Sequence, residues 1–435
     1  MIQTATKKEK TNRGRVTLLV ALIGCVLIAT SFALDTPGGI LEGEWAIMTS
    51  PGILITDFIA VGGLGAAFFN AGINTFIGLC LAWLLGARFN GTLLSAIFTL
   101  IGFSFFGKTP FNILPVLLGV YLYDRFLATE RSGNLTAVML FATTLGPIVS
   151  QTAFGFGWGP AGLPAGIALG ILAGGLTEAV SGHVFSVHKG YNLYNIGTTA
   201  GFVGTGIYML MRAFGLKIDA AFFWSSEHTD FLAVYMLILL LIVIVLGFAW
   251  GAKLSSYKDI LSRSGRMGTD FIEAAGLGTT LMNMGLVGLI SLGYIVLIGG
   301  DINGAILAGI FTALGFGALG KHPVNIIPVM LGVYIMCAFS IWSHSEPGPM
   351  LAALFGVTLA PFSGHFGPLA GMAAGMLHLP MLMHVGGFHG FLNLYNNGFA
   401  GGLVMLLITG VIQGVKPDWL TEDWRERRSI QDAKE

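Results

Sequence analysis

The chain has 435 residues, of which 54% are hydrophobic and 10% are charged, and its formal net charge at pH 7 is zero. Soluble proteins carry charged side chains at about a quarter of their positions, so the composition excludes an ordinary soluble domain. Apolar runs of about 20 residues, the length that crosses a bilayer, recur along nearly the whole chain. We therefore predict an all-α, multi-pass membrane protein whose partners are the lipid bilayer and a small solute.

A basic N-terminus precedes the first apolar run, residues 16–34. This run is long for a signal peptide and lacks a clear cleavage motif of small residues, so we expect a first transmembrane helix. Residues 35–50 contain three acidic side chains and no Lys or Arg. The positive-inside rule predicts an external loop there.

The next apolar stretch, residues 51–86, is too long for one span and includes a Gly62-Gly63 pair and Asn70. It predicts a broken or partly re-entrant helix, because breaks inside a membrane must line a cavity or find protein partners. Two shorter apolar segments follow at 91–106 and 111–127. They form either two short spans or one re-entrant hairpin.

The first half continues with apolar segments at 135–149 and 161–180, a polar break at 183–195, and a helix that ends near Phe214. The second half begins with an apolar helix at 231–252. The loop that follows, residues 253–266, carries four basic side chains and is predicted to lie inside, whereas the corresponding helix of the first half ends outside.

The charge pattern therefore predicts two inverted repeats, residues 1–218 and 219–435, with about seven apolar segments each. The whole chain would contain roughly 10–14 transmembrane helices, some of them broken or re-entrant. The basic tail, with Arg425, Arg427 and Arg428, places the C-terminus inside. We expect a cell (inner) membrane protein with both termini in the cytoplasm.

The duplication is visible in the residues themselves. Residues 56–121 and 269–334 align without a gap, and 32 of the 66 positions are identical. Both copies contain the pattern G-K-x-P-x-N-I-x-P, at 107–115 and 320–328. A second pattern, H-V-x3-H-x3-N-L-Y-N-x-G, occurs at 183–197, and its counterpart begins at His384. Apolar composition alone does not produce such matches.

Inverted repeats place a solute near the membrane midplane, where broken helices of the two halves meet. Lys and Asn interrupt apolar sequence at these breaks, and Asn offers both a donor and an acceptor to a polar solute. The lysines could instead anchor the segment ends at the membrane surface. The predicted substrate-binding residues are Asn70, Lys108, Asn112, Asn283, Lys321 and Asn325.

Further polar residues repeat inside apolar sequence and are candidates for ion coupling or gating, because intramembrane carboxylates are costly and tend to be functional. The alternative is that the carboxylates cap helices and that the His and Asn side chains anchor loops. The candidates are Asp57, Asp270, Glu273, His183, His188, Asn192, Asn195, His384, His389, Asn393 and Asn396.

No cofactor, metal or nucleic-acid partner is predicted. The two histidines of each motif are five residues apart, which does not place them on one helix face. Cys25, Cys80 and Cys337 show no spacing typical of a zinc site or a disulfide framework. A monomer and a homo-oligomer are both compatible with the sequence.

Through the doubled G-K-x-P-x-N-I-x-P and H-V-x3-H-x3-N-L-Y-N-x-G patterns, the chain resembles an uncharacterised family of bacterial polytopic membrane proteins, known only as a domain of unknown function. This resemblance covers essentially the full chain and implies no activity.

A weaker resemblance is to urea transporters, whose inverted halves carry a Gly/Asn-rich turn followed by a Pro-Phe-Asn turn. Residues 69–72 (F-N-A-G) and 110–112 (P-F-N) stand in that order in the first half. The second half lacks Phe in both turns, and the two lysines do not belong to that pattern.

These observations favour a transporter that moves a small polar or ionic solute through a site between the repeats. The alternatives are a facilitative channel of the urea-transporter type and a membrane-embedded enzyme that uses the repeated His, Asn and Lys residues. We expect a protein that is not an enzyme, because an active site is seldom needed twice in opposite orientations.

Overall fold

The computed structural model describes residues 7–420, and this part of the chain is helical throughout, with no β-strand. The first half contains α1 (Lys7–Leu34), α2 (Pro37–Thr49), α3 (Phe58–Leu84), α4 (Gly91–Phe103), α5 (Pro110–Leu122), α6 (Leu135–Ala142), α7 (Gly146–Ser150), α8 (Gly162–His188) and α9 (Asn195–Ala213). The second half contains α10 (Thr229–Ala249), α11 (Leu254–Ser262), α12 (Phe271–Ala275), α13 (Leu277–Leu297), α14 (Gly304–Phe316), α15 (Pro323–Phe339), α16 (Pro347–Gly356), α17 (Ala360–Phe366), α18 (Pro368–Val385) and α19 (Asn396–Val415).

Nine helical segments within residues 7–420 are long and apolar enough to cross a membrane. Several of them join consecutive helices, such as α6, α7 and the short turns around them in the segment Leu135–Gly155. The two helices α4 and α14 have 13 residues each, so each is about 20 Å long. That is shorter than the hydrocarbon core of a bilayer, about 30 Å, and it agrees with the predicted short segments.

Glycine breaks the long apolar stretch at the same place in both halves. In α3 the helix is interrupted at Gly63, which has φ 82° and ψ 167°. In the second half, α12 ends and α13 begins at the corresponding Gly276, with φ 84° and ψ 158°. Residues that carry a side chain rarely adopt a positive φ, so glycine is the residue that permits this break. The broken helix predicted from the sequence is confirmed.

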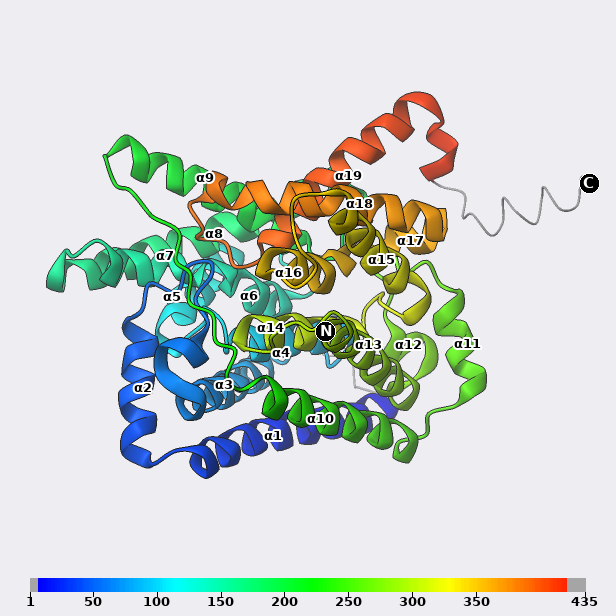
Figure 1. The fold of residues 1–435 in the computed structure, drawn as a ribbon, viewed down its shortest axis with the longest axis horizontal. Helices are drawn as coiled ribbons and strands as arrows, with labels where there is room; N and C mark the ends of the chain where they lie inside the picture. Colours follow the sequence, from blue (N-terminus) through cyan, green and yellow to red (C-terminus); the bar gives the residue numbers. More distant parts are fainter. Residues whose placement is uncertain (1–6, 421–435) are drawn as a thin grey trace, which may run out of the picture.

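The short helices α4 and α14 pack against each other in the middle of the molecule (Figure 1). Almost all of their residues are buried. A Cβ atom added to Gly91, at the start of α4, would lie 2.3 Å from the carbonyl oxygen of Ala318, just past the end of α14. A Cβ atom added to Gly304 would lie 2.2 Å from the carbonyl oxygen of Phe105. The start of each helix therefore lies at the end of the other, so the two corresponding helices are antiparallel.

A second close contact between the halves joins α9 and α19 near their first turns. A Cβ atom on Gly197 would lie 3.1 Å from the Cα of Gly398, and one on Gly398 would lie 2.9 Å from the Cα of Gly197. Both glycines are counterparts in the repeated motif, and only a residue without a side chain allows this approach. Reciprocal contacts of this kind are what an approximate two-fold relation between two bodies produces.

Three segments differ locally from the sequence-based expectations. The predicted external loop 35–50 contains helix α2, which begins at Pro37 after a side-chain cap from Thr36. The predicted internal loop 253–266 contains α11. The polar break at 183–195 is shorter than predicted, because α8 continues to His188 and ends with Lys189 in the left-handed conformation. The basic tail residues Arg425, Arg427 and Arg428 lie outside the described residues.

Helices α2 and α11 offer a direct test of the predicted topology, because Glu42 on α2 and Ser255 on α11 are both exposed. In a variant lacking the three native cysteines, we expect a membrane-impermeant maleimide added to intact cells to modify Glu42→Cys and to spare Ser255→Cys. Permeabilised cells serve as the control, because both cysteines should then react. Modification of Ser255→Cys in intact cells would contradict the inverted arrangement.

Candidate functional site

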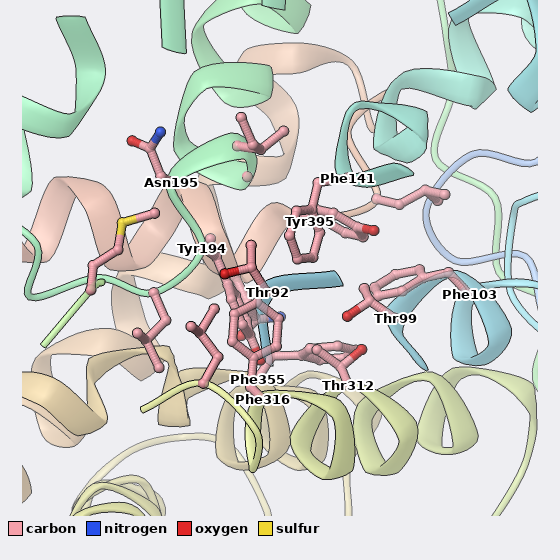
Figure 2. Close-up of a pocket in the computed structure, with 18 residues that line it drawn as sticks. Thr92, Thr99, Phe103, Phe141, Tyr194, Asn195, Thr312, Phe316, Phe355 and Tyr395 are labelled. Carbon is pink, nitrogen blue, oxygen red and sulfur yellow. The ribbon is translucent and has the colours of Figure 1, made fainter. Parts of the chain in front are cut away.

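A cavity of about 60 Å³ lies between the two halves, next to α4 and α14. Corresponding residues of both halves line it. These pairs are Thr99 and Thr312, Phe103 and Phe316, Phe141 and Phe355, Leu193 and Leu394, Tyr194 and Tyr395, and Gly197 and Gly398. Figure 2 shows Thr99, Phe103, Thr312 and Phe316 on one side of the cavity, with Tyr395 and Asn195 across from them. A cavity lined twice by the same residues belongs equally to both halves.

The two lysines of the repeated motif each bind a tyrosine of the other half. The Nζ of Lys108 donates a hydrogen bond to the hydroxyl of Tyr395 at 2.5 Å, and the Nζ of Lys321 donates one to the hydroxyl of Tyr194 at 2.5 Å. Both lysines are fully buried. The rings of Phe103 and Tyr395 lie 5.3 and 4.6 Å from the Lys108 nitrogen, within the range of a cation–π interaction.

Lys321 has the same surroundings, with the rings of Tyr194 and Phe316 at 4.6 and 5.0 Å from its nitrogen. Because α4 and α14 are antiparallel, the turns that carry Lys108 and Lys321 stand at opposite ends of this helix pair. The sequence predicted that these breaks of the two halves meet near the membrane midplane. That arrangement is wrong, since a 13-residue helix separates the turns by about 20 Å and both lysines are enclosed.

The two tyrosines are positioned by asparagines of the same motif. The backbone N–H of Tyr194 donates to the side-chain oxygens of Asn192 and Thr358 at 3.1 and 3.0 Å. In the other half, the N–H of Tyr395 donates to Asn393 and Thr144 at 3.0 and 2.8 Å.

The same asparagines also cross between the halves. The amide of Asn192 donates to the carbonyl of Gly398 at 2.9 Å, and the amide of Asn393 donates to the carbonyl of Gly197 at 3.1 Å. These bonds fix the crossing of α9 and α19 and the direction of both tyrosine side chains. We infer that Asn192 and Asn393 position the cavity rather than move within it.

The four asparagines predicted to bind substrate are bound to the protein itself, and none of them lines the cavity. The amide of Asn70 donates to the carbonyls of Ser104 and Lys108 at 2.5 and 2.8 Å. The amide of Asn283 donates to the corresponding carbonyls of Gly317 and Lys321 at 2.7 and 2.8 Å.

Asn112 accepts from the N–H of Thr109 and donates to the carbonyl of Gly107 at 2.9 Å each. Asn325 makes the equivalent bonds with His322 and Gly320 at 2.9 and 2.8 Å. The backbone groups freed by the Pro breaks thus find partners in asparagine amides of the protein, which a membrane interior requires. These side chains brace the turns that carry the lysines.

The repeated aspartates, predicted as coupling candidates or helix caps, cap helices of both halves. The carboxylate of Asp57 accepts from the N–H of Ile59 at 3.0 Å, from the N–H of Gly304 at 3.1 Å, and from the N–H and hydroxyl of Ser225 at 3.0 and 2.5 Å. It therefore caps its own helix α3 and the start of α14.

Asp270 repeats this arrangement, because it accepts from Ile272 and Glu273 of α12 and, at 2.8 Å, from Gly91 at the start of α4. Burial raises the pKa of both carboxyl groups, and the hydrogen bonds oppose that rise. The unmatched Glu273 forms an ion pair with Arg88 at 2.9 Å, and more than half of each side chain is exposed. Such a surface pair contributes little to stability.

The histidines of the second motif divide into an exposed and a buried pair. His183 and His384 are exposed near the ends of α8 and α18. His188 and His389 are buried, and their Nε2 atoms lie 2.9 Å from the side-chain oxygens of Asn195 and Asn396. Within residues 7–420, no group of three or more His, Cys, Asp or Glu is arranged to hold a metal ion.

The sequence-based reasoning missed the residues that form the cavity. Tyr194 and Tyr395 occupy identical places in the second motif, and Thr99 and Thr312 are matched in the first alignment. The repetition that identified the Lys and Asn candidates could therefore also have identified these Tyr and Thr residues. Among the candidates, Asn195 is the one that lines the cavity.

The long apolar helices and the buried cavity between two corresponding halves indicate a multi-pass helical membrane protein. The chain belongs to the family described as "Protein of unknown function (DUF1576)", whose sequence profile matches residues 36–213 and 251–414. The two matched stretches correspond closely to the two halves. No curated protein and no solved structure matches the chain.

Proposed function

We propose that the protein is a secondary transporter that carries a small polar or ionic solute across the cell membrane through the cavity between its halves. The observation that carries this proposal is the double lining of the cavity, in which each half supplies a lysine to the tyrosine of the other. A site shared equally by two corresponding halves can present the same contacts to a solute arriving from either side.

The antiparallel packing of α4 and α14 supports an inverted relation between the halves. Corresponding helices that run in opposite directions are what inversion about an axis in the membrane plane requires, and such transporters bind solute at the interface of their repeats. Alternating access would then arise when one half moves against the other around the cavity. Both termini would lie in the cytoplasm.

Transport explains the cavity better than catalysis does. Its described lining consists of apolar, hydroxyl and amide side chains, and the repeated histidines and asparagines that an enzyme would use are bonded to each other. A facilitative channel of the urea-transporter type remains the second candidate, because the Asn-containing turns are repeated. Those asparagine amides, however, hold the protein's own carbonyls.

Accessibility of the cavity from both sides of the membrane tests this proposal without knowledge of the solute. We would place one cysteine at Thr312, which lines the cavity, in a variant whose three native cysteines are replaced by Ala. The matched control is Ser291→Cys, because Ser291 is equally buried in α13 but does not line the cavity. The anionic, membrane-impermeant reagent MTSES is then added to right-side-out and inside-out vesicles.

We expect Thr312→Cys to react from both sides and faster than Ser291→Cys, because a transporter opens its site to each compartment in turn. Reaction from one side alone would indicate a pocket that serves a single compartment, and it would contradict transport. Reaction no faster than that of Ser291→Cys would show a closed internal void and would also contradict it.

A further inference from the structure

We propose that Glu44 is a proton-binding site, and that a proton on its carboxyl group keeps helix α2 seated on the break in α3. The inference goes beyond the proposed function and does not depend on it, since proton binding can be measured whether or not the cavity carries a solute. The burial of Glu44, the contacts of α2, the counterpart in the second half and the surrounding charges each support it.

Glu44 is the acidic residue on the buried face of α2. This face consists of Ile40, Gly43, Glu44 and Ile47, whose spacing places them on one side of a helix. Only 7% of Glu44 is exposed, and its Oε2 atom is buried with no hydrogen-bond partner within residues 7–420. A carboxylate that lacks both water and a partner is costly, whereas the protonated carboxyl group costs much less. The packed structure therefore favours the neutral form of Glu44.

The face of α2 that carries Glu44 lies directly on the helix break. A Cβ atom added to Gly43 would lie 2.0 Å from the carbonyl oxygen of Gly62, and one added to Gly62 would lie 2.7 Å from the side chain of Ile47. Gly62 precedes Gly63, where α3 is interrupted. Because Gly43 and Ile47 are neighbours of Glu44 on the same face, a charge on Glu44 would act on the contact between α2 and the broken part of α3.

The second half has an uncharged polar group at the same place. The offset that aligns the two halves pairs α2 with α11 and Glu44 with Tyr257. Ile47 and Ile260, three positions farther on in each helix, are both fully buried, so the two helices present the same face to the protein. The Tyr257 hydroxyl is also buried and has no partner in the described part of the chain. A tyrosine stays neutral at physiological pH, so of these two groups only Glu44 can release a proton there.

The charged groups around α2 do not compensate an ionised Glu44. Helix α2 packs mainly on α3 and also contacts α1 and α5, and the charges of α1 lie within residues 7–15, at the end remote from α2. The charged residues that flank α2 and α3 are acidic and oppose a further negative charge; they are Asp35, Glu42 and Asp57. The other titratable side chains of α1, α3 and α5 are those of Cys25, Cys80 and Tyr121. Burial raises the pKa of the Glu44 carboxyl to about 7.

A proton suits this site better than a metal cation. Metal cations are bound by several ligands at once, and no group of three or more His, Cys, Asp or Glu within residues 7–420 is arranged to hold one. A proton needs only the single carboxyl group. The ionised Glu44 would take up a proton from water and become neutral as α2 seats on α3, and it would return that proton to water when the two helices separate.

Thermal unfolding of the full-length protein in lipid nanodiscs, measured from pH 5 to pH 8, tests the proton site. The folded state holds the Glu44 proton more tightly than the unfolded state does, so the stability that this proton contributes is present at low pH and is lost as the pH rises through about 7. We expect the melting temperature of the parent to fall over this range by about 5 °C more than that of Glu44→Gln, which stays neutral. The matched control is Glu42→Gln, since Glu42 is exposed on the same helix and its loss should leave the parent's profile unchanged.

Cysteine labelling measures the seating of α2 with Glu44 in place. In the variant that lacks the three native cysteines, Ile47→Cys and Ile260→Cys probe equivalent buried positions on α2 and α11. Each rate of reaction with a maleimide is divided by the rate of the same variant in SDS at the same pH, which removes the effect of pH on the thiol itself. Between pH 5.5 and pH 8 we expect this ratio to rise about 10-fold for Ile47→Cys, as Glu44 ionises. It should stay constant for Ile260→Cys, and also for Ile47→Cys combined with Glu44→Gln.

Equal pH profiles for the parent and Glu44→Gln would overturn the proton site, and a constant ratio for Ile47→Cys would overturn the seating of α2 by the proton. Exchanging N-methylglucamine for Na⁺ at pH 8 distinguishes a proton from a cation. If Na⁺ raises the melting temperature of the parent but not that of Glu44→Gln, the site binds sodium and the inference is wrong; no effect of Na⁺ supports a proton. The labelling of Thr312→Cys reports on the cavity alone, so the transport proposal and the proton site can fail separately.

Discussion

We expect Asp57→Ala to lower the apparent melting temperature by about 10 °C. Asp57 is fully buried and accepts four hydrogen bonds, two of them from Ser225 and one from Gly304 at the start of α14. Removing it leaves these donors unpaired in a buried site, and breaking a buried charged group's contacts costs about 3–5 kcal/mol. A large domain loses about 2–4 °C per kcal/mol.

Two further variants serve as comparisons for the loss of stability. Asp270→Ala should cost less, because Asp270 is only partly buried and accepts three hydrogen bonds. Asp219→Ala should cost almost nothing, because Asp219 is exposed. Melting is followed by intrinsic tryptophan fluorescence in nanodiscs.

The result also separates capping from ion coupling. Suppose that Asp57→Ala melts like the parent but no longer moves a solute that the parent transports. Asp57 then acts in ion coupling, and its hydrogen bonds between α3 and α14 contribute little to stability. A loss of stability with the expected ranking of the three variants identifies Asp57 as a clamp that ties α3 to α14.

We expect Asn112→Ala and Asn325→Ala to destabilise the fold by about 2–3 kcal/mol each, which is about 4–12 °C in melting temperature. In Asn112→Ala, the N–H of Thr109 and the carbonyl of Gly107 both lose their side-chain partner. An unsatisfied buried group costs about 1–3 kcal/mol. The turn that carries Lys108 would loosen, so the hydrogen bond from Lys108 to Tyr395 should weaken as well.

The control is Asn134→Ala, because Asn134 is exposed and its side chain caps nothing. Parent-like melting of Asn112→Ala and Asn325→Ala together with loss of solute binding would contradict bracing. It would instead return these asparagines to the solute pathway that the sequence suggested.

The repetition in the sequence predicted much of the architecture. A helix break was predicted within the apolar stretch 51–86, which is too long to span a bilayer once, and it is present at Gly63, with its counterpart at Gly276. The short segment at α4 was predicted for a related reason. These features depend on local composition and on length against bilayer thickness, so one sequence is enough to reveal them.

The partners of the repeated polar residues could not be predicted in this way. An asparagine offers the same donor and acceptor to a solute and to a backbone carbonyl, so its residue type does not reveal which one it binds. Asn70 and Asn112 were expected at a solute, but after folding both donate to carbonyls of the turn that carries Lys108. A break in a helix exposes those carbonyls, and the membrane offers them no water.

The pairing of each lysine with a tyrosine of the other half was decided by the tertiary structure alone. The alignment shows that Lys108 corresponds to Lys321 and Tyr194 to Tyr395, but it does not show that each lysine binds the tyrosine of the other half, 287 positions away for Lys108. That pairing follows from the antiparallel packing of α4 against α14 and from the crossing of α9 and α19 at two glycines. The sequence by itself determined the two halves and the residues that they repeat. Only their packing brought two tyrosines, each bound to a lysine of the other half, to one cavity beside the first turns of α9 and α19, because contacts between distant segments depend on how whole helices fit together.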